Sequence, residues 1–208
     1  MSDSTGTVFV VDDDEPVRDA IGLLLDTVDI DHQSFASAQD FLDAYDRSMT
    51  GCLVLDIRMP GMSGLELQEH LLAQKAPIPI IFITGHGDIP MAVEAMKKGA
   101  LDFIRKPFRD QELLDRVHDA LSLDEENRQS FSDLEKIRQN ISTLTPREYE
   151  VFERVAEGQA NKVVAIDLAI SERTVEIHRS QVMQKTKARS LADLVKMKIR
   201  IDLDRTTH

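Results

Sequence analysis

The side chains best suited to chemistry in this sequence share one position, because each stands at the end of a short apolar segment. They are Asp12, Asp13, Asp56, Thr84 and Lys106. Carboxylates that crowd together repel one another unless a cation lies among them. Mg²⁺ suits such a group because it binds one or two carboxylates and keeps its other positions for water and phosphate oxygens. With a hydroxyl and an ammonium nearby, one carboxylate can then act as a nucleophile toward phosphorus.

Each of these residues also has an ordinary structural interpretation. Asp14 could cap a helix that begins near Pro16. Thr84 could end a strand, and Lys106 could be a solvated charge before a turn. A helix cap would account for one or two acids of the run DDDE at residues 12–15, but not for all four. The same kind of position recurs after four separate apolar segments, and this coincidence favours a metal-dependent phosphoryl-transfer site.

The elements that would position these side chains alternate through the first 123 residues. The apolar segments that predict strands are Val8–Val11, Ile30–Phe35, Cys52–Leu55, Ile78–Ile83 and Leu101–Ile104. A helical spacing of apolar residues follows each segment. Five such alternations predict a doubly wound α/β domain with a five-stranded parallel sheet. Ligands bind outside the carboxyl ends of the strands in such sheets, which is where the chemically active side chains would meet.

The second part of the chain is predicted to be entirely helical. Residues 124–142 are polar, lack Gly and Pro and keep a helical spacing, which predicts a charged helical linker. Thr145 and Glu148 then match a helix capping box. Two short helices with a tight turn between them follow, the second one basic, and this pattern fits a helix-turn-helix. The predicted divisions are therefore 1–123, the linker, and a small all-α domain over 143–208.

Charge is spread unevenly along the 208 residues, whose net charge is -12. Residues 1–142 hold 13 Lys or Arg and 27 Asp or Glu, whereas residues 143–208 hold 12 and 10. An acidic unit joined to a more basic one suggests that the second unit faces nucleic acid. The sequence has no run of 18 apolar residues and no signal-peptide pattern, which predicts a cytoplasmic protein without a membrane partner. Cys52 is the only cysteine, which excludes an internal disulfide.

Several segments, taken in order, resemble those of a known family. VFVVDDDEPVR, LVLDIRMPGMSG, IIFITGHGD and ALDFIRKPF are similar to the signature segments of bacterial response-regulator receiver domains, which have a flavodoxin-like fold. Residues 144–195, which include ISERTVEIHRSQVMQKT, resemble a LuxR-type helix-turn-helix. In this combination the chain resembles two-component response regulators of the NarL/FixJ class, and TGHGDIPMAVEAMKKGA is most similar to the FixJ regulators.

The resemblance assigns roles to the residues of the first unit. A sensor histidine kinase is expected to phosphorylate Asp56 in a reaction that needs Mg²⁺. The implied metal ligands are Asp12, Asp13, Asp56 and the backbone carbonyl of Arg58. The residues implied to contact the phosphoryl group or to switch with it are Thr84, Phe103 and Lys106. The resemblance also implies a cis peptide bond between Lys106 and Pro107.

In the second unit the resemblance places a recognition helix over about residues 171–185, in the major groove of promoter DNA. The residues expected to contact DNA are Lys162, Arg173, Thr174, Glu176, Ile177, His178, Arg179, Ser180 and Lys185. Glu176 departs from the lysine that some relatives carry, so base preference does not carry over. Residues 88–123 are expected to form a homodimer face when the protein is phosphorylated. RNA polymerase is a further expected partner.

Two other functions compete with a transcription regulator. An enzyme with an aspartyl-phosphate intermediate, such as a phosphatase, would need a second acid just after Asp56, where IRMP offers none. No GxSxG elbow supports a methylesterase output. A protein-interaction or RNA-binding regulator would lack the basic residues of the last helices. We therefore expect a non-enzymatic transcription regulator, controlled by dimerisation alone or also by release of an inhibited DNA-binding domain.

Overall fold

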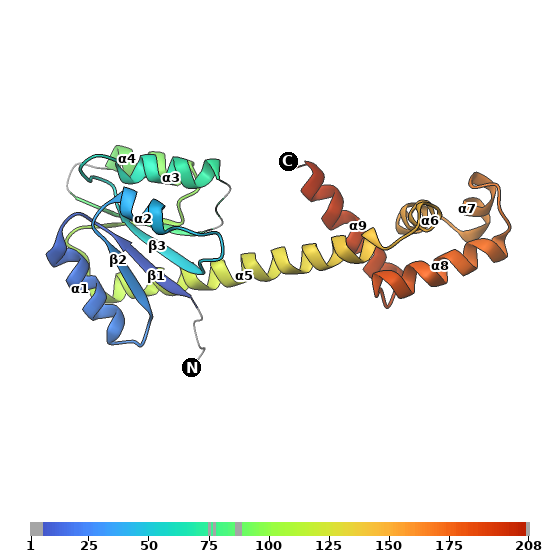
Figure 1. The fold of residues 1–208 in the computed structure, drawn as a ribbon, viewed down its shortest axis with the longest axis horizontal. Coiled ribbons are helices and arrows are strands. Elements are labelled where there is room, and N and C mark those ends of the chain that lie inside the picture. The colour runs from blue at the N-terminus through green and yellow to red at the C-terminus, as the bar shows by residue number, and fades with distance from the viewer. Residues whose placement is uncertain (1–5, 75, 77, 86–88, 207–208) are drawn as a thin grey trace. The chain divides into compact units, whose positions relative to one another are not determined.

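The computed structural model describes residues 6–74, 76, 78–85 and 89–206 of the chain (Figure 1). The chain divides into two compact units, residues 1–128 and residues 129–208. The first unit is an α/β domain and the second is all helical. Each unit has its own apolar core, as two separately folding domains require.

Parallel strands form the centre of the first unit. They are β1 (Thr7–Val11), β2 (His32–Phe35), β3 (Gly51–Asp56), β4 (Ile80–Thr84) and β5 (Asp102–Arg105). Their order in the sheet is β2-β1-β3-β4-β5, so the strand order reverses between β1 and β3. The five-stranded doubly wound fold expected from the apolar segments is confirmed. The bounds differ slightly, since β2 begins at His32 because the N–H group of Ile30 still donates to Leu25 at the end of the preceding helix.

Helices cover both faces of this sheet. They are α1 (Glu15–Asp26), α2 (Ala38–Ala44), α3 (Gly64–Ala73), α4 (Ile89–Lys97) and α5 (Asp110–Ser142). One apolar core lies between the sheet and α2, α3 and α4, and the other lies between the sheet and α1 and α5 (Figure 1). Val8 and Val10 face the second core, whereas Phe9 and Val11 face the first. Burial on both faces explains why the β1 sequence is continuously apolar instead of alternating.

The segment expected to be a charged linker is part of α5, a single helix of 33 residues. Near its middle, Asp124 is only 2% exposed. Its carboxylate accepts the Gly51 N–H group at 2.7 Å and pairs with Arg128 at 2.9 Å. Toward its end, Ile137 and Ile141 pack in the core of the second unit. The helical prediction is confirmed, but several residues of the segment are packed against the two units and are not solvated linker.

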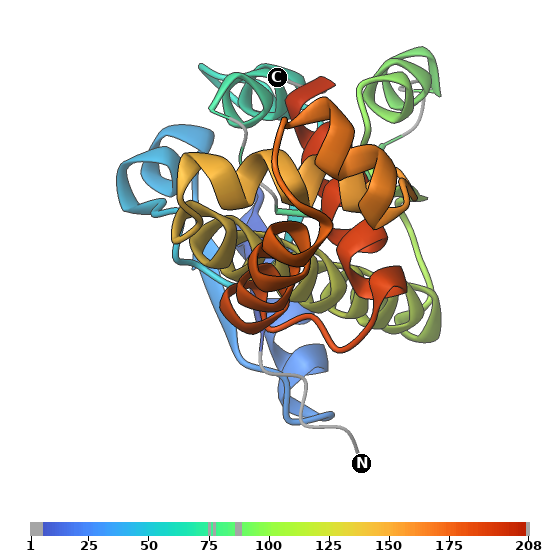
Figure 2. The same ribbon diagram turned by 90° about the vertical axis from the view of Figure 1, so that its right-hand side faces the viewer.

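The second unit consists of the end of α5 and of α6 (Pro146–Ala156), α7 (Asn161–Asp167), α8 (Glu172–Thr186) and α9 (Leu191–Thr206), packed around one core (Figure 2). Thr145 and Glu148 form the expected capping box at the start of α6. Ser171 caps α8 by accepting the Thr174 N–H group. Gly158, with a φ of 83°, follows the end of α6, where a left-handed conformation favours glycine. The helix-turn-helix expected over α7 and α8 is present.

Candidate phosphoacceptor site and DNA-binding face

Three carboxylates meet at the carboxyl ends of β1 and β3. The two strands are parallel neighbours, and Val11 is the partner of Leu55, so the residues that follow lie side by side. Ligand oxygens of Asp12, Asp13 and Asp56 all lie within 4.8 Å of one another. Asp12 is fully buried and Asp13 is exposed, so the cluster opens to solvent on one side. This donor set fits a hard divalent cation that keeps some water ligands.

Lys106, just after β5, supplies the ammonium group of the site. Its Nζ atom donates to Asp12 Oδ2 at 2.7 Å and to Asp56 Oδ2 at 3.3 Å. The Lys106 N–H group also donates to the Thr84 carbonyl at 2.7 Å, which fixes the end of β5 against β4. The peptide bond between Lys106 and Pro107 is cis, as the resemblance implied. Topology therefore brings the predicted lysine to the predicted carboxylates.

The electrostatics of the site favour a bound cation. Burial raises the pKa of Asp56, and the nearby Asp12 raises it further, while Lys106 partly offsets both. Burial alone would lower the pKa of Lys106, but its hydrogen bond to Asp12 and the charge of Asp56 raise it overall. A divalent ion among the carboxylates would favour their ionised forms and so oppose the effect of burial on Asp56.

The backbone turn after β1 holds Asp12 in place. Asp12 Oδ1 accepts the Asp14 N–H group at 2.9 Å, and its backbone carbonyl accepts a hydrogen bond from Arg18 at 2.7 Å. Asp14 does occupy the N-cap position of α1, but its side chain makes no capping hydrogen bond. Capping therefore leaves the acidic side chains unexplained. Sequence reasoning missed Arg18, because no periodic pattern links it to Asp12.

The loop between β3 and α3 returns close to the phosphoacceptor position. A Cβ atom on Gly64 would lie 2.2 Å from the backbone oxygen of Asp56, so only glycine fits there. The Gly64 N–H group donates to the Ile57 carbonyl at 3.0 Å. Ser63 and Glu66 form a capping box that starts α3. The role of Gly64 was not foreseen, although the glycine- and proline-rich sequence predicted a shaped loop.

The remaining residues predicted for this site lie at its edge. Thr84 is 3% exposed, and its hydroxyl donates to the Gly85 carbonyl at 3.0 Å, away from the carboxylates. Phe103 lies on β5 with its ring 38% exposed. Arg58 is exposed, and its backbone N–H group donates to Asp56. The structure thus joins Lys106 directly to the carboxylates, whereas Thr84 and Phe103 touch none of them.

In the second unit most residues predicted to contact DNA lie on or beside α8. Those classed as exposed are Lys162, Arg173, Glu176, Ile177 and Ser180. Those that are half-buried are Thr174, His178, Arg179 and Lys185. Ile177 is 56% exposed, which is unusual for an isoleucine unless a partner covers it. The exposed set forms one accessible stripe that can enter a DNA groove.

Arg179 and Lys185 already have partners within the unit. Arg179 donates to Asn161 Oδ1 at 3.0 Å and so connects α8 to α7. Lys185 donates to Glu148 Oε2 at 2.6 Å, and the Glu148 side chain is only 8% exposed. The Lys185 ammonium therefore stabilises the joint between α6 and α8. Its pairing with Glu148 was not visible in the sequence, because 37 residues separate the two.

Comparison with known proteins agrees with both halves of the structure. The family "Response regulator receiver domain" matches residues 8–118. The family "Bacterial regulatory proteins, luxR family" matches residues 142–198. The chain belongs to the NarL/FixJ class of two-component response regulators.

Relatives of this response regulator align over nearly its whole length. The response regulator TodT of Pseudomonas putida is 44% identical over 201 residues, which are 97% of this chain and 88% of TodT. The regulatory protein FixJ of Bradyrhizobium diazoefficiens is 43% identical over 195 residues, 94% of this chain and 95% of FixJ. A structure of the response regulator StyR, 48% identical, covers 94% of this chain and 98% of its own with a TM-score of 0.82.

Full-length FixJ from B. japonicum has also been solved and is 42% identical to this response regulator. That structure covers 96% of this chain and 98% of its own with a TM-score of 0.60. The relatives are transcriptional regulators, a non-enzymatic family, so the phosphatase interpretation is set aside. No helix in the described part of the chain is long and apolar enough to cross a membrane.

Proposed function

We propose that a sensor histidine kinase activates this response regulator by transferring a phosphoryl group to Asp56, with Mg²⁺ as the cofactor. The observation that carries the proposal is the group of Asp12, Asp13 and Asp56, whose ligand atoms lie within 4.8 Å of one another beside the Lys106 ammonium. These carboxylates and the backbone carbonyl of Arg58 would hold the ion. Mg²⁺ would supply the positive charge that lets an anionic phosphoryl group approach an acidic site.

The reaction makes one bond and breaks one. An oxygen of Asp56 forms a P–O bond as the P–N bond of the kinase phosphohistidine breaks. Lys106 then pairs with a phosphoryl oxygen in place of a carboxylate. Thr84 turns its hydroxyl from the Gly85 carbonyl toward a second phosphoryl oxygen, and the Phe103 ring moves inward behind it.

The output of this switch is promoter binding by α8 in a major groove. Ile177, Glu176 and Ser180 face base edges, whereas Lys162 and Arg173 contact phosphates. The half-buried predicted residues Thr174, His178, Arg179 and Lys185 contact DNA only through what their packing leaves accessible. In this proposal they chiefly orient α8. RNA polymerase in the cytoplasm would then read the bound regulator.

Phosphorylation controls this output by pairing two copies through α4, β5 and the start of α5. The expected face begins at Asp88, which lies outside the described residues, as does the side chain of Ile89. Val93 and Met96 are 45% and 38% exposed. Charged neighbours of both signs on this face include Asp102 and Arg116, which pair at 2.7 Å within the chain. A two-fold pair suits a domain with one recognition helix, because two half-sites give enough base contacts.

Labelling with a radioactive small-molecule phosphodonor and Mg²⁺ tests the proposal. Asp56→Asn should abolish incorporation while the fold is kept, and Asp14→Asn, an exposed neighbour, should not change it. Full incorporation into Asp56→Asn would exclude this residue as the acceptor. Light scattering with and without phosphodonor tests dimerisation of the intact protein. If residues 143–208 bind promoter DNA without phosphorylation, release of an inhibited domain also takes part.

A further inference from the structure

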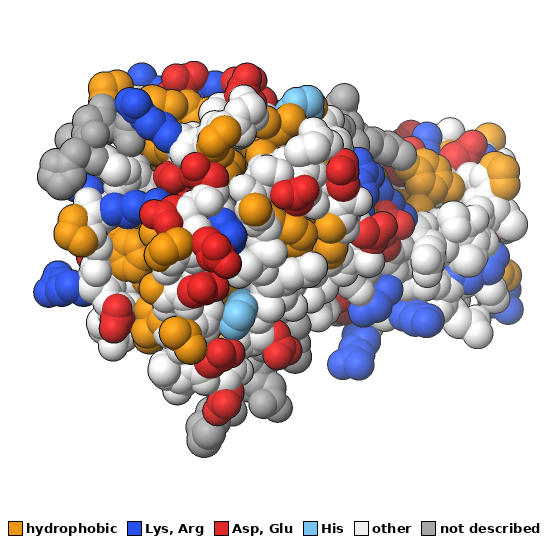
Figure 3. Space-filling model, turned by 60° about the vertical axis from the view of Figure 1, so that its left-hand side comes forward, with side chains coloured by type: hydrophobic (Ala, Val, Ile, Leu, Met, Phe, Trp, Pro, Cys, Tyr) orange, Lys and Arg blue, Asp and Glu red, His pale blue; other side chains and the backbone are white. Residues whose placement is uncertain are grey.

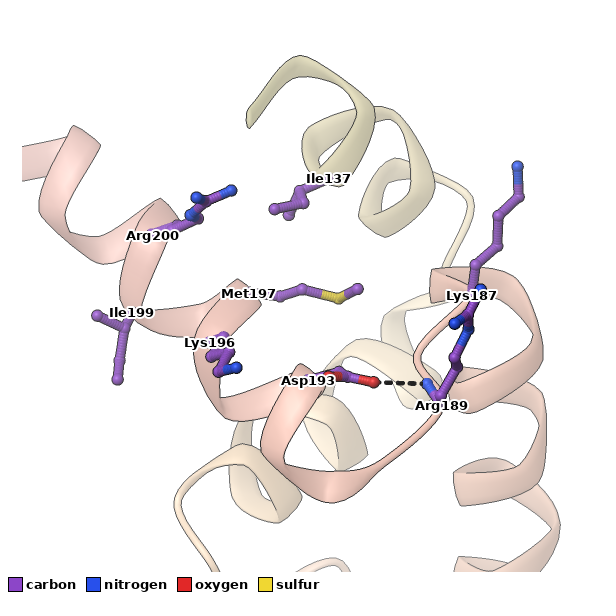
Figure 4. Close-up of a pocket in the computed structure, with 8 residues that line it drawn as sticks. All are labelled: Ile137, Lys187, Arg189, Asp193, Lys196, Met197, Ile199 and Arg200. Atoms are coloured by element: carbon purple, nitrogen blue, oxygen red, sulfur yellow. Dashed lines mark hydrogen bonds between the residues drawn. The ribbon is translucent and has the colours of Figure 1, made fainter. Parts of the chain in front are cut away.

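The second unit contains a hollow of about 560 Å³ that neither the phosphorylation site nor the DNA-binding face uses. It lies between the end of α5 and α9, next to the residues that follow α8 (Figure 4). Its lining combines apolar and basic side chains: Ile137, Lys187, Arg189, Asp193, Lys196, Met197, Ile199 and Arg200. Met197 lies in the middle of this group, with Ile137 and Arg200 beside it (Figure 4). We call this region the α9 hollow.

The four cations of the α9 hollow differ from most cations of the second unit. Lys185 pairs with Glu148, Lys198 with Glu157 and Asp202, and Arg138 with Glu135 and Asp204. By contrast, no hydrogen bond or ion pair joins the charged groups of Lys187, Arg189, Lys196 or Arg200 to another described residue. Lys162 and Arg173 on the DNA-binding face are in the same condition. The cations with no such bond therefore fall into two separate groups.

The acid in the lining does not neutralise these cations. The Asp193 carboxylate accepts the N–H groups of Arg189 at 2.9 Å and Ser190 at 3.1 Å. Those hydrogen bonds, the Arg189 one first, hold the pKa of Asp193 below its usual range, with a smaller contribution from the charge of Lys196. Asp193 thus serves the start of α9 and leaves a net positive hollow. A partner that fits this region must carry negative charge.

The apolar part of the lining decides which kind of anion fits. Ile137 and Met197 are half-buried against the core, while Ile199 is 52% exposed. One turn further along α9, Leu203 is 64% exposed. A DNA duplex presents phosphates on a convex surface and offers no apolar group to such side chains. A second copy placed on the same region by two-fold symmetry would bring Lys196 and Arg200 against like charges.

We propose that the α9 hollow is the docking site for a short segment of a partner protein in which Asp or Glu side chains flank an apolar side chain. The apolar side chain packs on Met197 and Ile199, and the acids pair with Lys196, Arg200 and their basic neighbours. Because the hollow belongs to the DNA-binding unit, such a partner is carried to wherever that unit binds. Docking itself does not depend on DNA binding or on phosphorylation.

Fluorescence anisotropy of the full-length protein with a defined probe tests this site. The probe is a fluorescein-labelled peptide of repeated Asp-Glu-Leu units, and its control peptide has Asn and Gln in place of the acids. The variant Lys196→Glu with Arg200→Glu should weaken peptide binding by about tenfold or more, since two charge pairs become repulsive. The control Lys162→Glu with Arg173→Glu makes the same charge change on the DNA-binding face. It should spare peptide binding and weaken DNA binding.

Two further variants separate docking from misfolding and from general charge effects. Lys196→Gln with Arg200→Gln removes charge without repulsion and should give a smaller loss of peptide affinity. Ile199→Ser, at an exposed position, should weaken the leucine-containing peptide but not a peptide with Ala in place of Leu. Equal peptide affinity in the wild type and the Lys196/Arg200 variant would overturn the proposal, as would equal losses in both charge-reversal variants. If the Lys196/Arg200 variant weakens only DNA binding, the hollow is a phosphate surface instead. Wild-type protein that binds peptide but no DNA would contradict the proposed function alone.

Discussion

The two units handle charge in opposite ways. The receiver buries Asp12 and half-buries Asp56 at a strand edge, and its one ammonium at that edge, Lys106, bonds to both. Acidic side chains are also spread over the outer face of the first unit (Figure 3). The DNA-binding unit instead leaves cations exposed, as at Lys162 and Arg173. Buried charge makes a site that waits for one small ion, whereas exposed charge makes a surface suited to a large polyanion.

This contrast predicts which lysines matter most for chemistry. Lys106→Met should slow labelling of Asp56 by about 10²–10³-fold, because a preorganised cation at the reacting group is lost. Lys98 is a matched control, since it pairs with Glu69 and Glu94 on the surface at 2.6 and 2.7 Å. Lys98→Met should label within about twofold of the wild type, as exposed pairs contribute little. Equal rates for the two variants would erase the contrast.

The buried carboxylate farthest from the phosphoacceptor should matter for stability. Asp124→Ala leaves the Gly51 N–H group without its carboxylate and Arg128 without its pair, so it should cost about 1–3 kcal/mol of unfolding free energy. Asp119→Ala removes an exposed partner of Arg116 and should change stability by less than about 0.5 kcal/mol. Urea unfolding of both variants gives the comparison. A small loss for Asp124→Ala would show that water replaces its contacts.

The pH response should differ between the units. Lys185 and the Thr145 N–H group hold the pKa of Glu148 below its usual range, so its stabilising effect is present above about pH 4.3 and is lost as pH falls through the folded-state pKa. Burial raises the pKa of Asp56, so protonation of that group relieves the receiver as pH falls. Hydrogen exchange should therefore show α6 losing protection in acid before β1 does. Glu148→Gln should weaken α6 protection and make it less sensitive to pH.

The smallest expected effects concern individual DNA contacts. Arg173→Ala should reduce the salt dependence of DNA binding by about one unit and weaken all sequences alike. Arg179→Ala should reduce it less, because that side chain already donates to Asn161. Ile177→Ala should change which sequences are preferred while leaving the salt dependence unchanged. Gel shifts at several salt concentrations measure all three. A change of sequence preference in Arg173→Ala would mean that α8 lies differently in the groove.

Local patterns made much of the fold predictable. Continuous apolar segments located the strands, and Thr145, Ser171 and Gly158 marked helix ends, because those signals act within a few residues. The carboxylate site was predictable for a similar reason, since parallel strands bring their carboxyl ends to one edge. The contacts between Asp124 and Gly51 and between Lys185 and Glu148 were not predictable. They join residues far apart in sequence, and only the packed tertiary structure decides that a polar side chain is buried there.

The Glu148 carboxylate serves two helices at once, and this has an evolutionary consequence. It completes the cap with Thr145 at the start of α6 and holds Lys185 near the end of α8. Losing the acid would orphan both partners, while losing either partner would leave the acid only half used. We therefore expect the three positions to be inherited together across related sequences. Replacement at one of them should be found chiefly in lineages where the other two have also changed.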